Sequence, residues 1–194
     1  MKKKYLLSVV LMLCLGVVGC TASQIEAYIT LAAQIAADAL SITSAFTGSP
    51  VSAHDSTLIT EWQTTLQSTV NSVEANKKAG NSTLLSISEA AETNLPQFLQ
   101  AAQFDNPALG ARVTAATDSF LQIVESIATI AGQPAPAVTT VTLSSGGLYR
   151  LPARRIVPMQ DIVTGWNTNA CPVASASCRA HTPTKTLLHP FSYR

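Results

Sequence analysis

The 194-residue chain is poor in charge, in aromatic side chains and in histidine: charged residues make up 12%, aromatic residues 6%, and there are three histidines. None of the histidines follows a glutamate by three positions, so the di-iron sites that helical bundles build from Glu-x-x-His pairs are excluded. The chain also lacks a Gly-x-Ser-x-Gly turn and a glycine-rich phosphate loop followed by lysine. We therefore predict no catalytic residue, no metal site and no bound cofactor.

Long apolar runs are missing as well. The apolar stretch 5–18 is shorter than the roughly 20 residues that a membrane-spanning helix needs. It follows three lysines, Lys2 to Lys4, and it ends in small residues. A cationic start, a short apolar run and a small-residue end are typical of an export signal. Residues 1–19 are therefore predicted to be a removable signal peptide.

The end of this signal is Val17, Val18, Gly19 and Cys20. This order resembles the lipobox of bacterial lipoproteins, and the resemblance covers the first 20 residues only. It implies cleavage between Gly19 and Cys20 and attachment of diacylglycerol and an N-acyl chain to the Cys20 thiol, the only cofactor-like group expected. More than one acyl chain gives firm membrane anchoring. Thr21 stands where inner-membrane lipoproteins often carry aspartate, so the outer membrane is favoured if the source has one. An ordinary secretory signal is the alternative.

Four cysteines are present, of which Cys14 lies in the signal and Cys20 is the expected lipid site. Cys171 and Cys178 remain, and two cysteines in an oxidising compartment predict one disulfide. Zinc binding with His181 and His189 is the alternative. Their wide spacing matches none of the tight ligand pairs of zinc sites, so a disulfide is favoured.

Charge is divided unevenly along the chain. Residues 21–132 carry three bases and ten acids, whereas residues 133–194 carry six bases and one acid. The acidic first part should repel nucleic acid and anionic lipid, so no nucleic-acid partner is expected.

Apolar residues recur at spacings of three and four along four segments of the body. The seams span residues 25–46, 59–73, 84–102 and 109–130. Short connections force consecutive helices to run antiparallel, which predicts an all-α, up-down four-helix bundle over about residues 24–132. Pro96 should kink or split the third helix near Thr93. Alanines at seam positions indicate close helix approach and argue against a large ligand pocket.

The chain from 133 to 194 differs in kind. A Pro-rich linker at 133–136 precedes a hairpin pattern, with strands over 138–143 and 148–151. Beyond Pro152 no period remains, so a loop or disordered tail that contributes little to the fold is predicted. The abrupt change in composition also leaves open a tail translated out of its ancestral frame.

Few residues remain as candidate binding sites. Trp62 lies on a seam and is expected in the core, whereas Trp166 lies in the tail and is the candidate for a partner contact. The basic residues Arg150, Arg154 and Arg155 are candidate contacts for a partner, with a solvated loop as the alternative. His54, next to Ser52 and Asp55, is expected to be a capping or solvated residue.

The acidic side chains of the body fall mostly off the seams and indicate a solvated face, for example Glu61 and Glu125. Serine, threonine and glutamine fill much of the remaining surface, and such a surface can bind proteins at low desolvation cost. These features favour a lipid-anchored, non-enzymatic structural or protein-interaction module of the cell envelope. Two other classes remain open: a carrier of a small apolar ligand between helices, and an enzyme whose site the sequence does not reveal.

Overall fold

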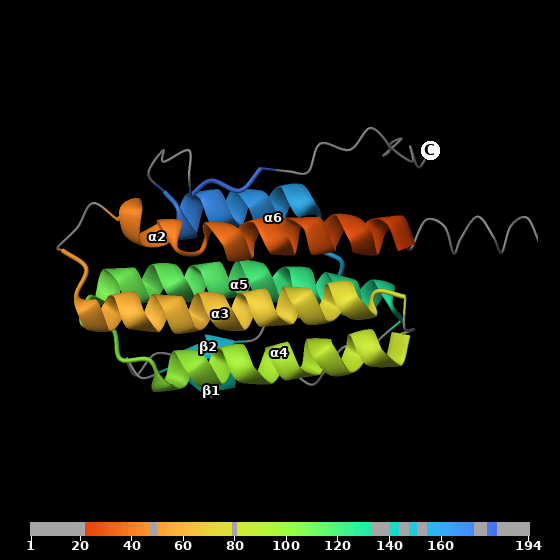
Figure 1. The fold of residues 1–194 in the computed structure, drawn as a ribbon, viewed down its shortest axis with the longest axis horizontal. Helices are drawn as coiled ribbons and strands as arrows, with labels where there is room; N and C mark the ends of the chain where they lie inside the picture. Colours follow the sequence, from red (N-terminus) through yellow and green to blue (C-terminus); the bar gives the residue numbers. More distant parts are fainter. Residues whose placement is uncertain are drawn as a thin grey trace, which may run out of the picture.

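Four long helices pack antiparallel in the computed structural model (Figure 1), which confirms the predicted all-α bundle. The helices are α1 over residues 22–38, α3 (Ala53–Asn76), α4 (Asn81–Ala101) and α5 (Pro107–Ile130). The structure describes residues 22–46, 50–78, 81–132, 140–143, 148–150, 155–172 and 178–181. Within these ranges no helix combines the length and the apolar character needed to cross a membrane.

The first predicted helix is divided in two. It ends at residue 38, a turn follows at 39–40, and the short helix α2 spans Ser41–Ser44. The Arg112 guanidinium of α5 holds the end of this segment, because its Nη1 donates to Ala45 O over 3.2 Å. It also stacks over the Phe46 ring, 4.9 Å from the centroid. The end of this segment is thus attached to α5.

The starts of α3 and α5 follow their sequence signals. Ser52 is the N-cap of α3, and its hydroxyl accepts from Asp55 N over 3.0 Å. Asn106 caps α5 by accepting from the backbone of the first turn, and proline follows it in the favoured position. Pro96, by contrast, lies inside a continuous α4, so the predicted split near Thr93 does not occur.

Helix α5 occupies the centre of the fold and is in contact with α2, α4, α6 and η1. Beyond its predicted seam it buries a second stripe, Leu121, Val124 and Ala128, at spacings of three and four. Glu125 is only 1% exposed, so its assignment to a solvated face is wrong. A helix that is apolar on more than one face belongs in the interior, and this second stripe was the available sequence signal.

A C-terminal segment completes the core. It contains α6 (Met159–Gly165) and the π-helical turn η1 (Trp166–Ala170), both of which lie against α5 (Figure 1). The prediction that the chain beyond Pro152 contributes little to the fold is therefore wrong for residues 155–172 and 178–181. A seven-residue helix is too short to display a helical period, which is why the pattern missed it. The segment adds the following residues to the core: Val157, Ile162, Val163, Trp166, Ala170, Cys171, Cys178 and Ala180.

A small antiparallel hairpin forms where the sequence predicts one. Strand β1 (Thr140–Thr142) pairs with β2 (Leu148–Arg150), with Val141 opposite Tyr149. Strand β1 lies against α4 (Figure 1). A hairpin of this size is marginal by itself, so the contact with α4 supports it.

Candidate functional site

Trp166 is not a surface residue. Its side chain is 0% exposed, and its indole Nε1 donates to Cys178 O over 2.8 Å. The prediction of a partner contact at Trp166 is therefore wrong. The sequence around it has no period that would have marked it as core, because the π-helical turn η1 does not share the spacing of an α-helical seam.

The disulfide between Cys171 and Cys178 is present, with the two Cα atoms 6.0 Å apart. Both residues are fully buried. The bridge joins η1 to residues 178–181, which are further held by hydrogen bonds. Asn167 Nδ2 donates to Ala180 O over 3.0 Å, and the Gln34 amide of α1, oriented to satisfy both groups, bonds His181 N and O at 2.8 and 2.7 Å. The disulfide is thus part of the core and closes the segment onto α1.

The predicted basic cluster is represented here by a single described side chain. Arg155 is exposed, and its carbonyl accepts from Ser126 Oγ over 3.4 Å. Arg154 and the side chain of Arg150 lie outside the described residues, as do Gly19 and Cys20, the predicted cleavage and lipid sites. The basic cluster at these three arginines therefore stays a prediction.

A buried polar clamp fixes the C-terminal segment between α1 and α5. Tyr28 Oη donates to Val157 O over 2.5 Å, while Val157 N donates to Ser126 Oγ over 3.1 Å. Burial raises the pKa of Tyr28, and the hydrogen bond with Ser126 opposes that change. The phenol therefore stays protonated and keeps donating at neutral pH. Both backbone groups of Val157 are satisfied, so the clamp is structural.

A second polar cluster connects the start of α3 to the loop before α5. The Asp55 carboxylate is 0% exposed and accepts from Asp105 N at 2.8 Å and from Asn106 N at 3.1 Å. His54 Nε2 lies 3.0 Å from Gln103 O. These bonds hold one end of the bundle together. Among the described residues no group of three or more histidine, cysteine or acidic side chains could hold a metal ion.

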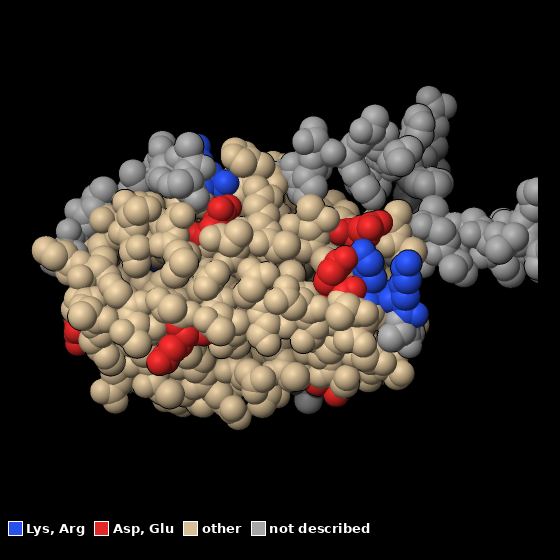
Figure 2. All heavy atoms as spheres, in the orientation of Figure 1, with Lys and Arg blue, Asp and Glu red and all other residues tan. Residues whose placement is uncertain are grey.

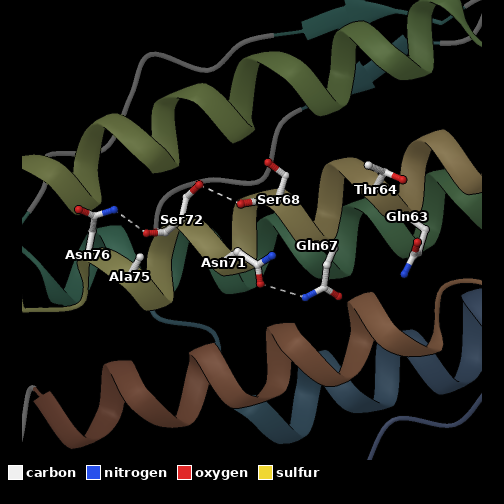
Figure 3. Close-up of a pocket in the computed structure, with 8 residues that line it drawn as sticks. All are labelled: Gln63, Thr64, Gln67, Ser68, Asn71, Ser72, Ala75 and Asn76. Atoms are coloured by element: carbon white, nitrogen blue, oxygen red, sulfur yellow. Dashed lines mark hydrogen bonds between the residues drawn. The ribbon is translucent and has the colours of Figure 1, made fainter.

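The outer face of α3 forms a shallow polar groove of about 550 Å³, which we call the α3 groove (Figure 3). Its side chains follow two adjacent rows with a spacing of four residues, and none is charged. Gln67 Nε2 donates to Asn71 Oδ1 over 3.2 Å within it. Without an ionisable group the groove offers hydrogen bonds but no acid or base. It is lined by Gln63, Thr64, Gln67, Ser68, Asn71, Ser72, Ala75 and Asn76.

An apolar groove of about 680 Å³ lies where α4 ends and α5 begins. We call it the α4–α5 groove. Gly110 borders it, and a Cβ at this position would meet the Phe104 ring at 3.1 Å, so glycine permits the close approach of that ring. The interior is different: where α1, α3 and α5 meet, the free space is about 10 Å³. The lining of the α4–α5 groove includes Leu99, Ala102, Phe104, Pro107, Ala111 and Leu143.

Charged side chains are sparse over the face drawn in Figure 2, where most of the described surface is uncharged. Two lysines at the end of α3, Lys77 and Lys78, gather with Glu26 and Glu74 at the end of the bundle where α1 begins.

Comparison of the chain with protein-family models, with curated proteins and with solved structures gives no match.

Proposed function

We propose that this chain is a cell-envelope lipoprotein whose helical body binds another protein and performs no catalysis. The observation that carries the proposal is the α3 groove, in which seven of the eight lining side chains offer hydroxyl or amide groups and none is charged. Uncharged polar groups lose less hydration energy on binding than ions do, so such a surface forms an interface at low desolvation cost.

The anchor follows from the lipobox-like order at residues 17–20, which makes Cys20 the acylated residue. Cys171 and Cys178 are joined to each other, so they offer no free thiol for acylation. We expect Cys20→Ser to lose metabolic acyl label and to leave the membrane fraction, because a hydroxyl is a poor substitute for the thiolate nucleophile. A variant that keeps its label and its membrane association would contradict the anchor.

Protein binding can be tested with a photo-crosslinking amino acid in whole cells of the source organism. Position 68 lies in the α3 groove, and position 86 is an exposed serine on α4. We expect a discrete crosslinked protein from position 68 that is missing at position 86. Asn71→Lys should reduce the crosslink from position 68, because it places a charge in the groove. Equal products from the two positions, or none from position 68, would argue against this interface.

A carrier of a small apolar ligand is the second candidate, and the α4–α5 groove favours it. The groove is lined mainly by aliphatic and aromatic side chains, and its lining contains no charged residue, which suits an uncharged apolar ligand. Ala111 lies in the lining and is exposed, whereas Ala108 is exposed on the same helix outside the lining. Ala111→Trp should therefore abolish binding of a fluorescent apolar probe that Ala108→Trp leaves intact. Probe binding that is unaffected by Ala111→Trp would exclude the groove.

A further inference from the structure

We infer that the end of the bundle where α1 begins rests directly on the lipid headgroups, so that the body stands on the membrane without a spacer. This inference rests on the proposed acylation of Cys20. The surface concerned consists of the first turns of α1 and the last turn of α3, and its partner is the headgroup layer itself.

Covalent reach is the first argument. The described part of α1 starts at residue 22, and Thr21 alone stands between that residue and Cys20 in the sequence. Two residues span at most about 7 Å even when fully extended. The first turn of α1 must therefore lie close to the acylated residue, whose chains are embedded in the bilayer. A body on a long flexible linker would have no such constraint.

The first turns of α1 are also fixed within the bundle. Ile25 and Tyr28 are buried, and the Tyr28 hydroxyl holds Val157. Lys77 Nζ, at the end of α3, lies 3.6 Å from Glu26 Oε1 and 2.5 Å from Glu74 Oε1. Because α1 is held in this way, the attachment of Cys20 constrains the whole body and not one loose helix.

The charge at this end is compatible with lipid phosphates. Glu26 and Glu74 balance Lys77 and the neighbouring, exposed Lys78, so these four side chains together carry no net charge. Figure 2 shows the lysines beside these acids at the end where the described part of α1 begins. A lysine near an anionic membrane surface is attracted to it. The covalent tether sets the position, and Lys78 adds a favourable contact.

This placement determines which surfaces a partner can reach. Helix α3 has 24 residues and is therefore about 36 Å long. The α4–α5 groove lies at the end of α4 and the start of α5, which is the end of the bundle remote from α1's first turn. The α3 groove follows the side of the body. A partner would thus approach from the side, and an apolar ligand from the end that faces away from the membrane.

The test uses two alanines of α3, Ala75 and Ala53, which are both exposed and lie 22 residues apart, about 33 Å along the helix. The full lipidated chain, as Ala75→Cys or Ala53→Cys, carries a fluorophore on the new thiol. It is reconstituted in phosphatidylcholine–phosphatidylglycerol vesicles that contain a lipid with a nitroxide on its headgroup. We expect position 75 to lose most of its fluorescence and position 53 to lose none.

Equal quenching at the two positions, in protein that floats with the vesicles, would overturn the docking inference and leave the anchor in place. Stronger quenching at position 53 would overturn it as well. Lipidated protein that fails to float would overturn the acylation of Cys20, and the docking inference with it. The Cys20→Ser form of the position-75 variant should remain in the aqueous fraction with unquenched fluorescence.

Discussion

Helices α3 and α5 have the same length, 24 residues, and each shows one predicted seam, yet they bury very different surfaces. Helix α3 buries six residues in one stripe that contains Trp62 and Leu66. Helix α5 buries thirteen, among them Thr117, Ser126 and Glu125. The difference shows that an apolar seam predicts one face by which a helix packs on the core, but does not predict how many neighbouring elements pack on that helix. Position in the bundle decides that.

The largest effect should come from a charge on the second stripe of α5. Leu121 is 0% exposed and lies off the predicted seam. Leu121→Asp loses apolar burial and places an unpaired carboxylate in the core, which should cost at least about 5 kcal/mol, comparable to the whole stability of many domains. We expect loss of cooperative thermal unfolding by circular dichroism.

Ser68→Asp on the exposed face of α3 is the matched control and should melt like the parent chain. If Leu121→Asp also melted like the parent, the result would show that α5 buries only one face, as α3 does.

The next effect concerns the segment that covers α5. Trp62 and Trp166 are both 0% exposed, and each donates its indole N–H to a buried acceptor. Trp166→Ala should lower the free energy of unfolding by about 3 to 5 kcal/mol, as Trp62→Ala should, because each leaves a large cavity. Denaturant melts of the two variants test this. An unchanged midpoint for Trp166→Ala would mean that the C-terminal segment is not part of the cooperative core.

Reduction of the disulfide should have a smaller effect. Cys171 and Cys178 are seven positions apart and buried beside Trp166. Opening the bridge should lower stability by about 2 to 4 kcal/mol, because it frees the unfolded chain and loosens the segment that covers α5. Thermal melts with and without reductant measure the change. Identical melts would place the bridge outside the cooperative unit, which is the behaviour expected of a remote tail loop.

The smallest effect compares two serines. Ser126 of α5 is 0% exposed and accepts from Val157 N, whereas Ser68 of α3 is exposed. Ser126→Ala leaves a buried N–H without its acceptor and should cost about 1 to 3 kcal/mol. Ser68→Ala should change stability by less than about 0.5 kcal/mol. Chemical denaturation measures the free energy of unfolding of both variants. Equal values would show that the hydrogen bond between Val157 N and Ser126 Oγ does not stabilise the fold.

Much of the bundle was predictable because its helices are long. Ile59, Trp62 and Leu66 repeat a spacing of three and four, and all three are fully buried as expected. Helix α6 was missed because its seven residues cover too few turns for a period to appear. The α4–α5 groove was missed for another reason. Its lining comes from the end of α4, the start of α5 and Leu143, and no local sequence pattern predicts that these segments lie together.

The sequence by itself determined the number of long helices, the capped starts of α3 and α5, the antiparallel order and one buried face of each helix. These features depend on local periodicity, capping residues and short connections, which act within a few turns of helix. Only the tertiary structure decided that α5 is central, that Glu125 is buried and that Trp166 belongs to the core. Burial of a second helix face depends on a segment some 30 residues further along the chain, as the bond between Val157 N and Ser126 Oγ shows. Contacts of that separation leave no period in the sequence.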